Sequence, residues 1–206
     1  MRPTPHLVVL LLVLVSLTAA AAPPPTFRES EWQAVQGRWR FEPDGQLTCA
    51  GETRSSLIYR RDTVARDLDL SVDVMFLGPE SSAGLVFRSV GRSFYRDTTF
   101  YQFEWYTAGH HHGRRLSLMV KNPRWKQIVS PVLRDAPFNR WIRFRVRVED
   151  ERIQCFIDNE RVFQRRDRTY RRAGRLGLHV FQPHRVQFRA PRLEILNPGP
   201  ASTRTR

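Results

Sequence analysis

The sequence predicts an all-β fold, a two-sheet antiparallel jelly-roll sandwich with little helix. Three observations support this class. Apolar and polar residues alternate with a period of two in many short segments, turn-forming residues separate these segments, and no stretch sustains the 3.6-residue period of an amphipathic helix. About a dozen short strands in one domain can bury their apolar faces only if two sheets pack together.

The first 22 residues have the pattern of a secretory signal peptide. Arg2 is followed by an unbroken apolar run over 7–15 and then by small residues. This run is too short to cross a bilayer, and no later run is long enough, so we expect no transmembrane segment. Cleavage near residues 20–22 would release a secreted or periplasmic protein. The expected organisation is then a linker over 23–30, one β-sandwich domain over 31–197 and a disordered tail over 198–206.

Two segments show the strand pattern most clearly. Residues 67–78 place leucine, valine and phenylalanine on one face and aspartate and serine on the other, and residues 141–150 alternate apolar residues with arginine. Turns are expected at 43–45, 78–79, 158–159 and 182–184, where Pro, Gly, Asp and Asn gather. The other expected strands, in chain order, are residues 38–42, 46–50, 55–61, 83–89, 99–106, 114–121, 126–130, 152–158, 160–166, 174–180 and 186–196.

The chain is strongly basic. Its formal net charge is +14, and removing Arg2 with the signal peptide leaves +13. The arginines are spread along the whole chain and do not gather in one segment, so a nucleic-acid partner is not favoured. Dispersed positive charge does attract any polyanion weakly, and an acidic polysaccharide or an anionic cell surface fits a secreted protein better.

The two cysteines, Cys49 and Cys155, both lie in expected strands and share a face with apolar neighbours. In an oxidising compartment they could form a disulfide, which would stabilise the fold by about 4 kcal/mol on a chain-entropy estimate. Two buried thiols are the alternative. Sequence alone provides no distance between them and leaves both open.

Three consecutive histidines, His110 to His112, suggest a metal site at first sight. They lie between two alternating segments, in a loop with Gly109 and Gly113 near its ends. Consecutive residues of an extended chain point in opposite directions, so three adjacent histidines do not converge easily on one ion. We therefore expect no metal here, but a solvated hairpin tip at the rim of a binding site.

Three segments carry more than periodicity: "SSAGLVFRS" (81–89), "FNRWIRFRVRVEDERIQCFIDNERVF" (138–163) and "GRLGLHVFQPHRVQFRAPRLEIL" (174–196). In this order they resemble the concanavalin A-like lectin and glucanase jelly roll, and within it the secreted bacterial 3-keto-disaccharide hydrolase-type domains. The resemblance covers about residues 27–197. The chain departs from the family pattern at His179, Phe181 and Ala190, and these departures bear on activity more than on fold.

The resemblance also indicates where a site would form, because sugars bind the concave sheet of that fold. Alternation places Leu85, Phe87 and their equivalents in the core and their neighbours on the opposite face. The residues expected to converge there are Arg88, Gln102, Tyr106 and Arg189 as substrate-binding groups and Glu104 and His179 as candidate general bases. The alternative is a solvated ladder of cross-strand Arg–Glu pairs that needs no ligand.

Several aromatic residues complete this expectation. Phe94 and Tyr95 are expected near the rim, Trp125 fits either packing or binding, and Trp32, Trp39 and Trp141 are expected to pack.

The predicted function is a secreted carbohydrate-interacting domain that binds a saccharide on its concave sheet. The alternative is a glycoside hydrolase acting on 3-keto-disaccharides or related glycosides. Retaining glucanases of this fold need an E-x-D-x-x-E strand for their two carboxylates, and the sequence has none. No cofactor is expected, and the sequence does not predict an oligomeric state.

Overall fold

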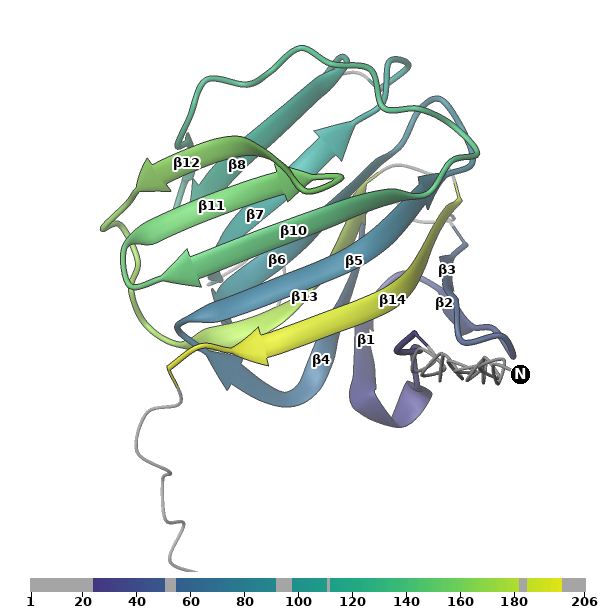
Figure 1. Ribbon diagram of the computed structural model, residues 1–206, viewed down its shortest axis with the longest axis horizontal. Helices are drawn as coiled ribbons and strands as arrows, with labels where there is room; N and C mark the ends of the chain where they lie inside the picture. Colours follow the sequence, from purple (N-terminus) through teal and green to yellow (C-terminus); the bar gives the residue numbers. More distant parts are fainter. Residues whose placement is uncertain (1–23, 51–54, 92–97, 111, 182–184, 198–206) are drawn as a thin grey trace, which may run out of the picture.

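The computed structural model describes residues 24–50, 55–91, 98–110, 112–181 and 185–197. Two antiparallel sheets of seven strands each pack face to face (Figure 1). The one helical element among the described residues is a short 3-10 turn, η1 (Glu29–Glu31). The predicted jelly-roll sandwich is confirmed.

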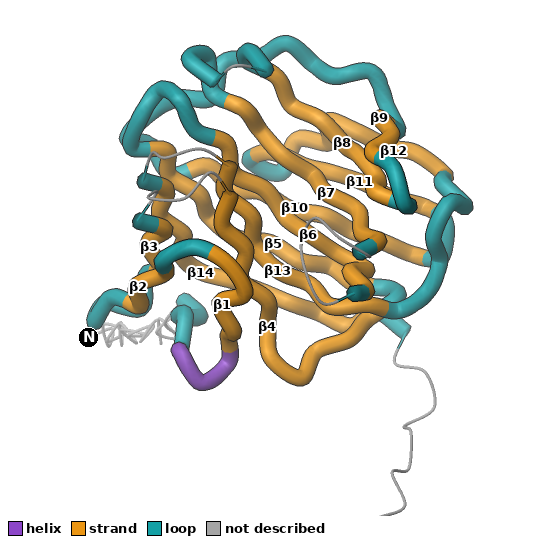
Figure 2. The backbone as a smooth tube through the Cα atoms, turned by 180° about the vertical axis from the view of Figure 1, so that it is seen from behind, coloured by secondary structure: helices purple, strands orange, loops and turns teal. Residues whose placement is uncertain are grey.

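Strand order and layers are visible in Figures 1 and 2. Sheet A has the order β1 (Trp32–Gln36), β4 (Ser55–Ala65), β13 (Gly174–Phe181), β6 (Ser82–Val90), β7 (Thr99–Tyr106), β8 (Arg115–Lys121) and β9 (Trp125–Gln127). Sheet B has the order β12 (Glu160–Arg166), β11 (Arg152–Ile157), β10 (Ile142–Glu149), β5 (Leu68–Phe76), β14 (Val186–Ile195), β3 (Leu47–Cys49) and β2 (Trp39–Phe41).

Every predicted strand is present, with small shifts at the ends. The expected strand over 126–130 is the short edge strand β9, which ends at Gln127. The sequence analysis missed β1, whose residues do not alternate clearly: Trp32 is buried but Gln33 and Ala34 are exposed. This edge strand exists because it pairs with β4, a partner that lies far along the chain.

The core lies between the sheets and follows the period-two pattern. In β10, burial alternates residue by residue, with the arginines on the outer face. Phe144 of β10 packs against Phe103 and Trp105 of β7, with ring centroids 5.7 and 6.0 Å apart. These contacts join sheet B to sheet A, so each sheet has an inner face toward its partner and an outer face away from it.

The two cysteines lie in the same sheet and not opposite one another. Both thiols are buried, and they form no disulfide. Strands β10, β5 and β14 separate β11 from β3, and neighbouring strands are about 4.8 Å apart, so the cysteines are roughly 19 Å apart. A disulfide needs Cα atoms within about 7 Å. Burial raises the pKa of the Cys155 thiol well above its usual value.

The N-terminal end of the described chain belongs to the packed domain. Phe27, in the predicted linker, is buried, and its ring lies 5.0 Å from that of Trp32. Its amide donates a hydrogen bond to the carbonyl oxygen of Gly45 (2.9 Å). The predicted signal peptide and tail lie outside the described residues. Among those described, no helix is long and apolar enough to span a membrane.

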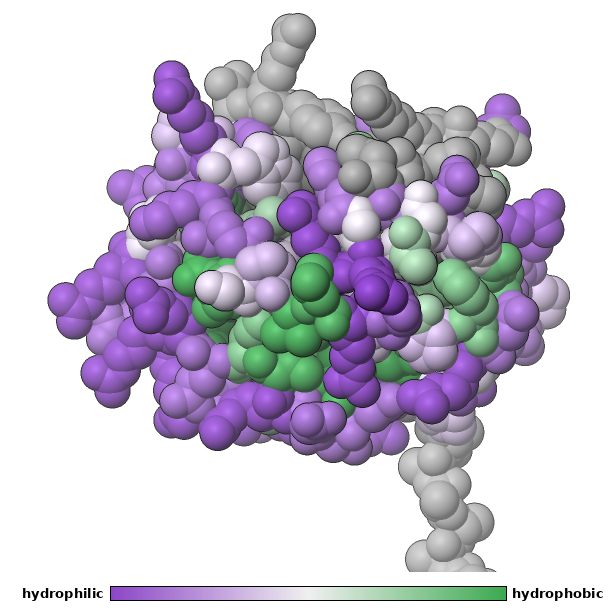
Figure 3. Space-filling view, turned by 90° about the horizontal axis from the view of Figure 1, so that it is seen from above, coloured by the Kyte–Doolittle hydropathy of each residue, from purple (hydrophilic) through white to green (hydrophobic). Residues whose placement is uncertain are grey.

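Hydrophilic side chains cover most of the face shown in Figure 3, around an apolar patch. The connection between β9 and β10 contributes exposed apolar side chains to the surface, with Leu133 the most exposed at 77%. Trp32 packs in the core and Trp39 is partly buried against it, as predicted. Trp141 lies under the guanidinium of Arg189, 4.3 Å from its ring centroid.

Candidate functional site

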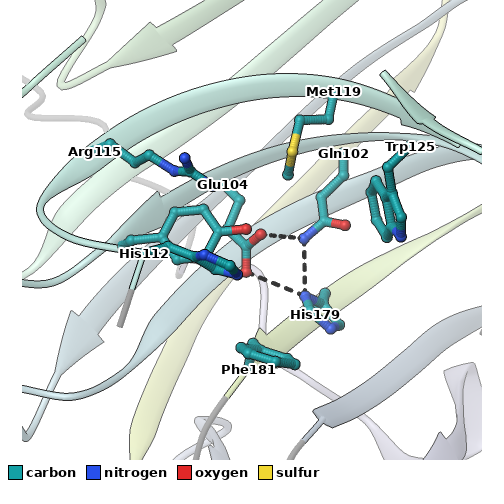
Figure 4. A pocket seen from close by; sticks show the side chains of 9 residues that line it. Gln102, Glu104, His112, Arg115, Met119, Trp125, His179 and Phe181 are labelled. Carbon is teal, nitrogen blue, oxygen red and sulfur yellow. Dashed lines mark hydrogen bonds and ion pairs between the residues drawn. The ribbon is translucent and has the colours of Figure 1, made fainter. Parts of the chain in front are cut away.

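A cavity of about 330 Å³ lies on the outer face of sheet A; we call it the sheet A cavity. Strands β7, β8, β9 and β13 and the loop between β7 and β8 supply its walls (Figure 4). Its lining residues are Gln102, Glu104, Tyr106, His112, Arg115, Met119, Trp125, His179 and Phe181. It combines aromatic surface with a polar centre.

Strand parity accounts for most of this lining. Tyr101, Phe103 and Trp105 point into the core, so the residues between them point to the outer face. Leu178 and Val180 are likewise in the core, which turns His179 outward between them. The structure therefore brings together four of the six predicted site residues, namely Gln102, Glu104, Tyr106 and His179.

Glu104 is at the centre of a buried hydrogen-bond network, and Figure 4 shows its contacts with Gln102 and His179. The Ser82 hydroxyl donates to its Oε1, and the amide of Gln102 donates to its Oε2. The His179 Nδ1 atom lies 3.3 Å from Glu104 Oε1 and 3.0 Å from Gln102 Nε2. Glu104 is 1% exposed and His179 2% exposed, so water does not screen this pair.

Gly84 allows Glu104 and His179 to meet. It lies on β6, between β7 and β13, and pairs with Glu104 on one side and His179 on the other. Strands β7 and β13 lie on either side of β6 and are therefore about 9.6 Å apart. A side chain at Gly84 would fill the space between Glu104 and His179. A Cβ there would come within 2.5 Å of the Phe103 carbonyl oxygen and 3.0 Å of the Glu104 Cβ. Glycine is thus the residue this arrangement requires.

The network holds Glu104 in its ionised form. Burial alone would raise the pKa of Glu104, but the hydrogen bond from His179, with further hydrogen bonds from Ser82 and Tyr106, outweighs burial and lowers the pKa below its ordinary value. Burial and the neighbouring Glu104 carboxylate raise the pKa of Tyr106. The Tyr106 hydroxyl therefore stays protonated beside the Glu104 carboxylate.

We expect Glu104→Gln to lower the free energy of unfolding at neutral pH by about 1–3 kcal/mol, the range for a hydrogen-bonded buried charge. The folded-state pKa of Glu104 is lowered, so its contribution is present above about pH 4.5 and is lost as pH falls through the folded-state pKa. Urea unfolding of both proteins from pH 7 to pH 3 measures this. A difference that stayed constant over that range would contradict an ionised Glu104.

The structure places Arg88 away from the cavity, contrary to prediction. A β-bulge interrupts β6: Phe87 pairs with Tyr101, but the next pair is Val90 with Thr99, one residue out of step. Arg88 takes a positive φ of 51° at this bulge and turns inward, where it is fully buried. One inserted residue reverses the parity of all that follows in the strand, and the sequence pattern did not reveal it.

Arg189 also lies elsewhere, on the outer face of sheet B. Strand β14 pairs with β5 and β3, so it belongs to the sheet opposite the cavity. There Arg189 forms an ion pair with Asp73 (3.3 Å) and stacks on Trp141. Alternation correctly predicted that Arg189 points outward, but it does not say to which sheet a strand belongs.

Several cavity residues were missed by the sequence analysis. Arg115 and Met119 lie on the outer face of β8, opposite Tyr106 and Gln102 in the register with β7. Their alternation with leucine was a usable signal, since β8 was expected to follow β7 in a hairpin. Phe181 continues the outward parity of His179. Trp125, which the sequence left open, lines the cavity and is 44% exposed.

The histidine loop packs on the cavity and is not a solvated tip throughout. His110 is 3% exposed, with its ring 4.6 Å from that of Tyr106, and His112 lines the cavity. The described residues contain no group of three or more His, Cys, Asp or Glu side chains arranged to hold a metal. His111, Phe94 and Tyr95 lie outside the described residues.

Three buried polar atoms on this face have no hydrogen-bond partner within the described structure: Gln102 Oε1, Arg115 Nε and Ser117 Oγ. Ser117 is the cross-strand neighbour of Glu104, between Arg115 and Met119 on β8. A buried polar group without a partner costs about 1–3 kcal/mol.

The two packed antiparallel sheets define the fold class, a jelly-roll sandwich of the concanavalin A and galectin type. Residues 27–194 match the model of the 3-keto-alpha-glucoside-1,2-lyase-like domain, and the chain belongs to this family. The predicted family resemblance is confirmed. No curated protein sequence matches the chain.

Solved structures share the fold at low sequence identity. The carbohydrate-binding module CBM66 from Bacillus subtilis is 18% identical, with a TM-score of 0.66 over 80% of this chain and 95% of its own. A protein of unknown function with a galectin-like fold, also from Bacillus subtilis, is 10% identical, with a TM-score of 0.66 over 81% and 90%. A putative glycosyl hydrolase from Parabacteroides distasonis is 13% identical, with a TM-score of 0.59 over 82% and 89%.

Proposed function

We propose that this protein binds a saccharide in the sheet A cavity. The observation that carries the proposal is the lining of that one cavity. Trp125 and Phe181 offer aromatic surface, and Gln102 and Arg115 offer polar side chains. A sugar ring has an apolar C–H face and a rim of hydroxyls, so it needs both kinds of surface at once.

The family and the fold support this proposal. The family model is named for a 3-keto-α-glucoside, and one structural neighbour is named as a carbohydrate-binding module. The signal-peptide pattern of residues 1–22 supports a secreted or periplasmic location, where glycans are available.

Replacing Trp125 by alanine is expected to weaken saccharide binding about five- to tenfold, because the ring loses its stacking contact. Titration calorimetry with methyl α-D-glucopyranoside and its 3-keto derivative, on wild type and variant, measures the loss. Trp141→Ala is the matched control, since Trp141 lies under Arg189 on the opposite sheet. Wild type that binds neither sugar, or a Trp125 variant that binds like wild type, would contradict the proposal.

The Glu104 and His179 pair favours a second function, the cleavage of a 3-keto-glycoside. Glu104 is the one carboxylate among the described lining residues, so a double-carboxylate glycosidase mechanism is not available to them. A ketone at C3 of a sugar makes the hydrogen at C2 acidic, and removal of that hydrogen needs only one base. In the tautomer with the proton on His179 Nδ1, that proton is donated to Glu104 and Gln102 Nε2 donates to Glu104 alone; the other ring nitrogen is then the base.

The reaction we propose is an elimination. His179 takes the C2 proton, and the C–H electron pair forms an enolate with its charge on the C3 oxygen. The enolate returns to the ketone as a C1–C2 double bond forms and the C1–O bond breaks; the leaving oxygen keeps that electron pair and accepts a proton. No oxidant, reductant or water is consumed. Arg115, which has no carboxylate partner among the described residues, would stabilise the enolate.

Incubation with methyl 3-keto-α-D-glucopyranoside tests this second function. Absorbance of the unsaturated ketone and chromatography of the released methanol follow the products together. Binding without turnover would leave the domain as a saccharide-binding module. Turnover that also requires water and yields no unsaturated product would indicate hydrolysis, the alternative expected from the sequence.

A further inference from the structure

We propose that the edge of sheet B carries a second, separate site, which binds the anionic groups of an acidic polysaccharide. A hollow of about 460 Å³ lies there, lined by Arg152, Gln164, Arg165 and Arg166. We call it the arginine corner. It belongs to β11 and β12, whereas the sheet A cavity is built from β7, β8, β9 and β13.

The register between β11 and β12 places two like charges directly opposite each other. Arg152 pairs with Arg166, and the next pair is Ile153 with Arg165. Directly opposed like charges destabilise an antiparallel pair. Elsewhere on the same face the register places opposite charges beside each other: Arg143 lies opposite Asp73 and forms an ion pair with it at 2.7 Å. The corner therefore departs from the charge pairing of its own sheet.

Nearby carboxylates compensate the corner only in part, because each forms its ion pair with an arginine outside it. Glu149 lies opposite Arg152 on β10 but accepts from Arg147 (2.5 Å). Glu151 bonds with Arg168, and Asp150 with Arg171 (2.6 Å).

Asp167, which follows β12, accepts the Tyr101 hydroxyl proton (2.6 Å). Among the described residues, Arg152, Arg165 and Arg166 form no ion pair within 4.0 Å. Three arginines without an ion pair of their own therefore line one hollow.

Gln164 orders the corner. Its Oε1 atom accepts hydrogen bonds from Arg152 Nη2 (3.3 Å) and from Gln154 Nε2 (3.1 Å). The hydrogen bond from Arg152 to Gln164 directs the Arg152 side chain toward β12, where Arg166 is its cross-strand neighbour. An arrangement that holds guanidinium groups together suits carboxylate or sulfate oxygens, which accept from their planar N–H groups.

A polysaccharide fits this corner better than a nucleic acid. Sequence-independent binders of single-stranded nucleic acid combine basic grooves with aromatic rings on which bases stack. Phe156 is the aromatic residue of β11, and the guanidinium of Arg145 covers its ring at 5.1 Å. Arginines without a stacking surface recognise charge along a chain, which is what an acidic polysaccharide offers.

Binding of three polymers tests the proposal: polygalacturonate for carboxylates, dextran sulfate for sulfates and neutral dextran as the uncharged reference. The triple variant Arg152→Gln, Arg165→Gln, Arg166→Gln is expected to bind the better acidic polymer about tenfold more weakly, since each exposed contact is worth a factor of about two or more. Wild-type binding should weaken between 50 and 200 mM salt, because the Debye length falls about twofold, from roughly 14 to roughly 7 Å.

Arg38→Gln, Arg40→Gln, Arg185→Gln is the matched control, because it removes the same charge beside β2, at the other edge of sheet B. Equal losses in the two triple variants would show attraction by net charge alone and overturn the proposal. So would equal affinity for neutral dextran, or tighter binding of single-stranded DNA. Saccharide binding in the sheet A cavity should be unchanged in both variants, so the two proposals fail or stand independently.

Discussion

Replacing Asp67 by alanine is expected to lower the free energy of unfolding by about 3–5 kcal/mol, because it leaves the buried guanidinium of Arg88 without its carboxylate partner. Arg88 is 0% exposed and Asp67 1% exposed, with Arg88 Nη2 3.4 Å from Asp67 Oδ1. Arg88 also donates to the backbone carbonyl oxygens of Arg66 (2.8 Å), Tyr170 (3.3 Å) and Asp150. These contacts hold the ends of several strands together, and Asp67 is the carboxylate at their centre.

The pH dependence of this pair follows from the direction of its pKa shift. Burial alone would raise the pKa of Asp67, but hydrogen bonds from Asn197, the Asp150 amide and Arg66 outweigh it and lower the pKa below 3.8. The contribution of Asp67 is therefore present above about pH 4 and is lost as pH falls through its folded-state pKa. Denaturant unfolding at pH 7 and pH 3 should show a smaller difference between wild type and variant at the lower pH.

Two comparisons separate this effect from a general loss of charge. Asp135→Ala removes the partner of Arg114 at an exposed pair and should change stability much less. The double variant Asp67→Leu, Arg88→Met removes both buried charges and should recover part of the loss. Recovery is incomplete because the carbonyl oxygens that accept from Arg88 lose their donor. If the double variant were less stable than Asp67→Ala, the stranded charge would not be the cause.

His179→Gln is expected to lower the rate constant kcat for cleavage of the 3-keto-glycoside by about 10²–10⁴, the usual range for removal of a general base. Glutamine keeps a polar side chain of similar reach but does not take up a proton. Because the sugar would still meet Trp125 and Arg115, KM should change much less than kcat. Steady-state kinetics with methyl 3-keto-α-D-glucopyranoside provide both constants.

Leu57→Val is a suitable control for this variant. Leu57 is the other cross-strand neighbour of His179, on β4, and it is buried without lining the cavity. Its shortening should leave kcat within about threefold of wild type. An unchanged kcat in the His179 variant would show that His179 is not the general base. The saccharide-binding proposal is tested separately by the calorimetry.

The candidate site was partly predictable because strand parity is a local property. Residues 101–106 alternate strongly enough to turn Gln102, Glu104 and Tyr106 to one face, and residues 176–180 do the same for His179. Arg88 and Arg189 escaped that reasoning for two different reasons. A bulge with a positive φ turned Arg88 inward, and the pairing of β14 with β5 moved Arg189 to the other sheet.

The sequence by itself determined the all-β class, the family, the strands other than β1 and the face on which most side chains lie. These properties depend on alternation and motif order along short segments, which neighbouring residues specify. The tertiary structure alone decided which strands became neighbours, and with that the meeting of Glu104 and His179 across Gly84. Strand pairing joins residues far apart in the chain, and its free energy comes from contacts that no local pattern records.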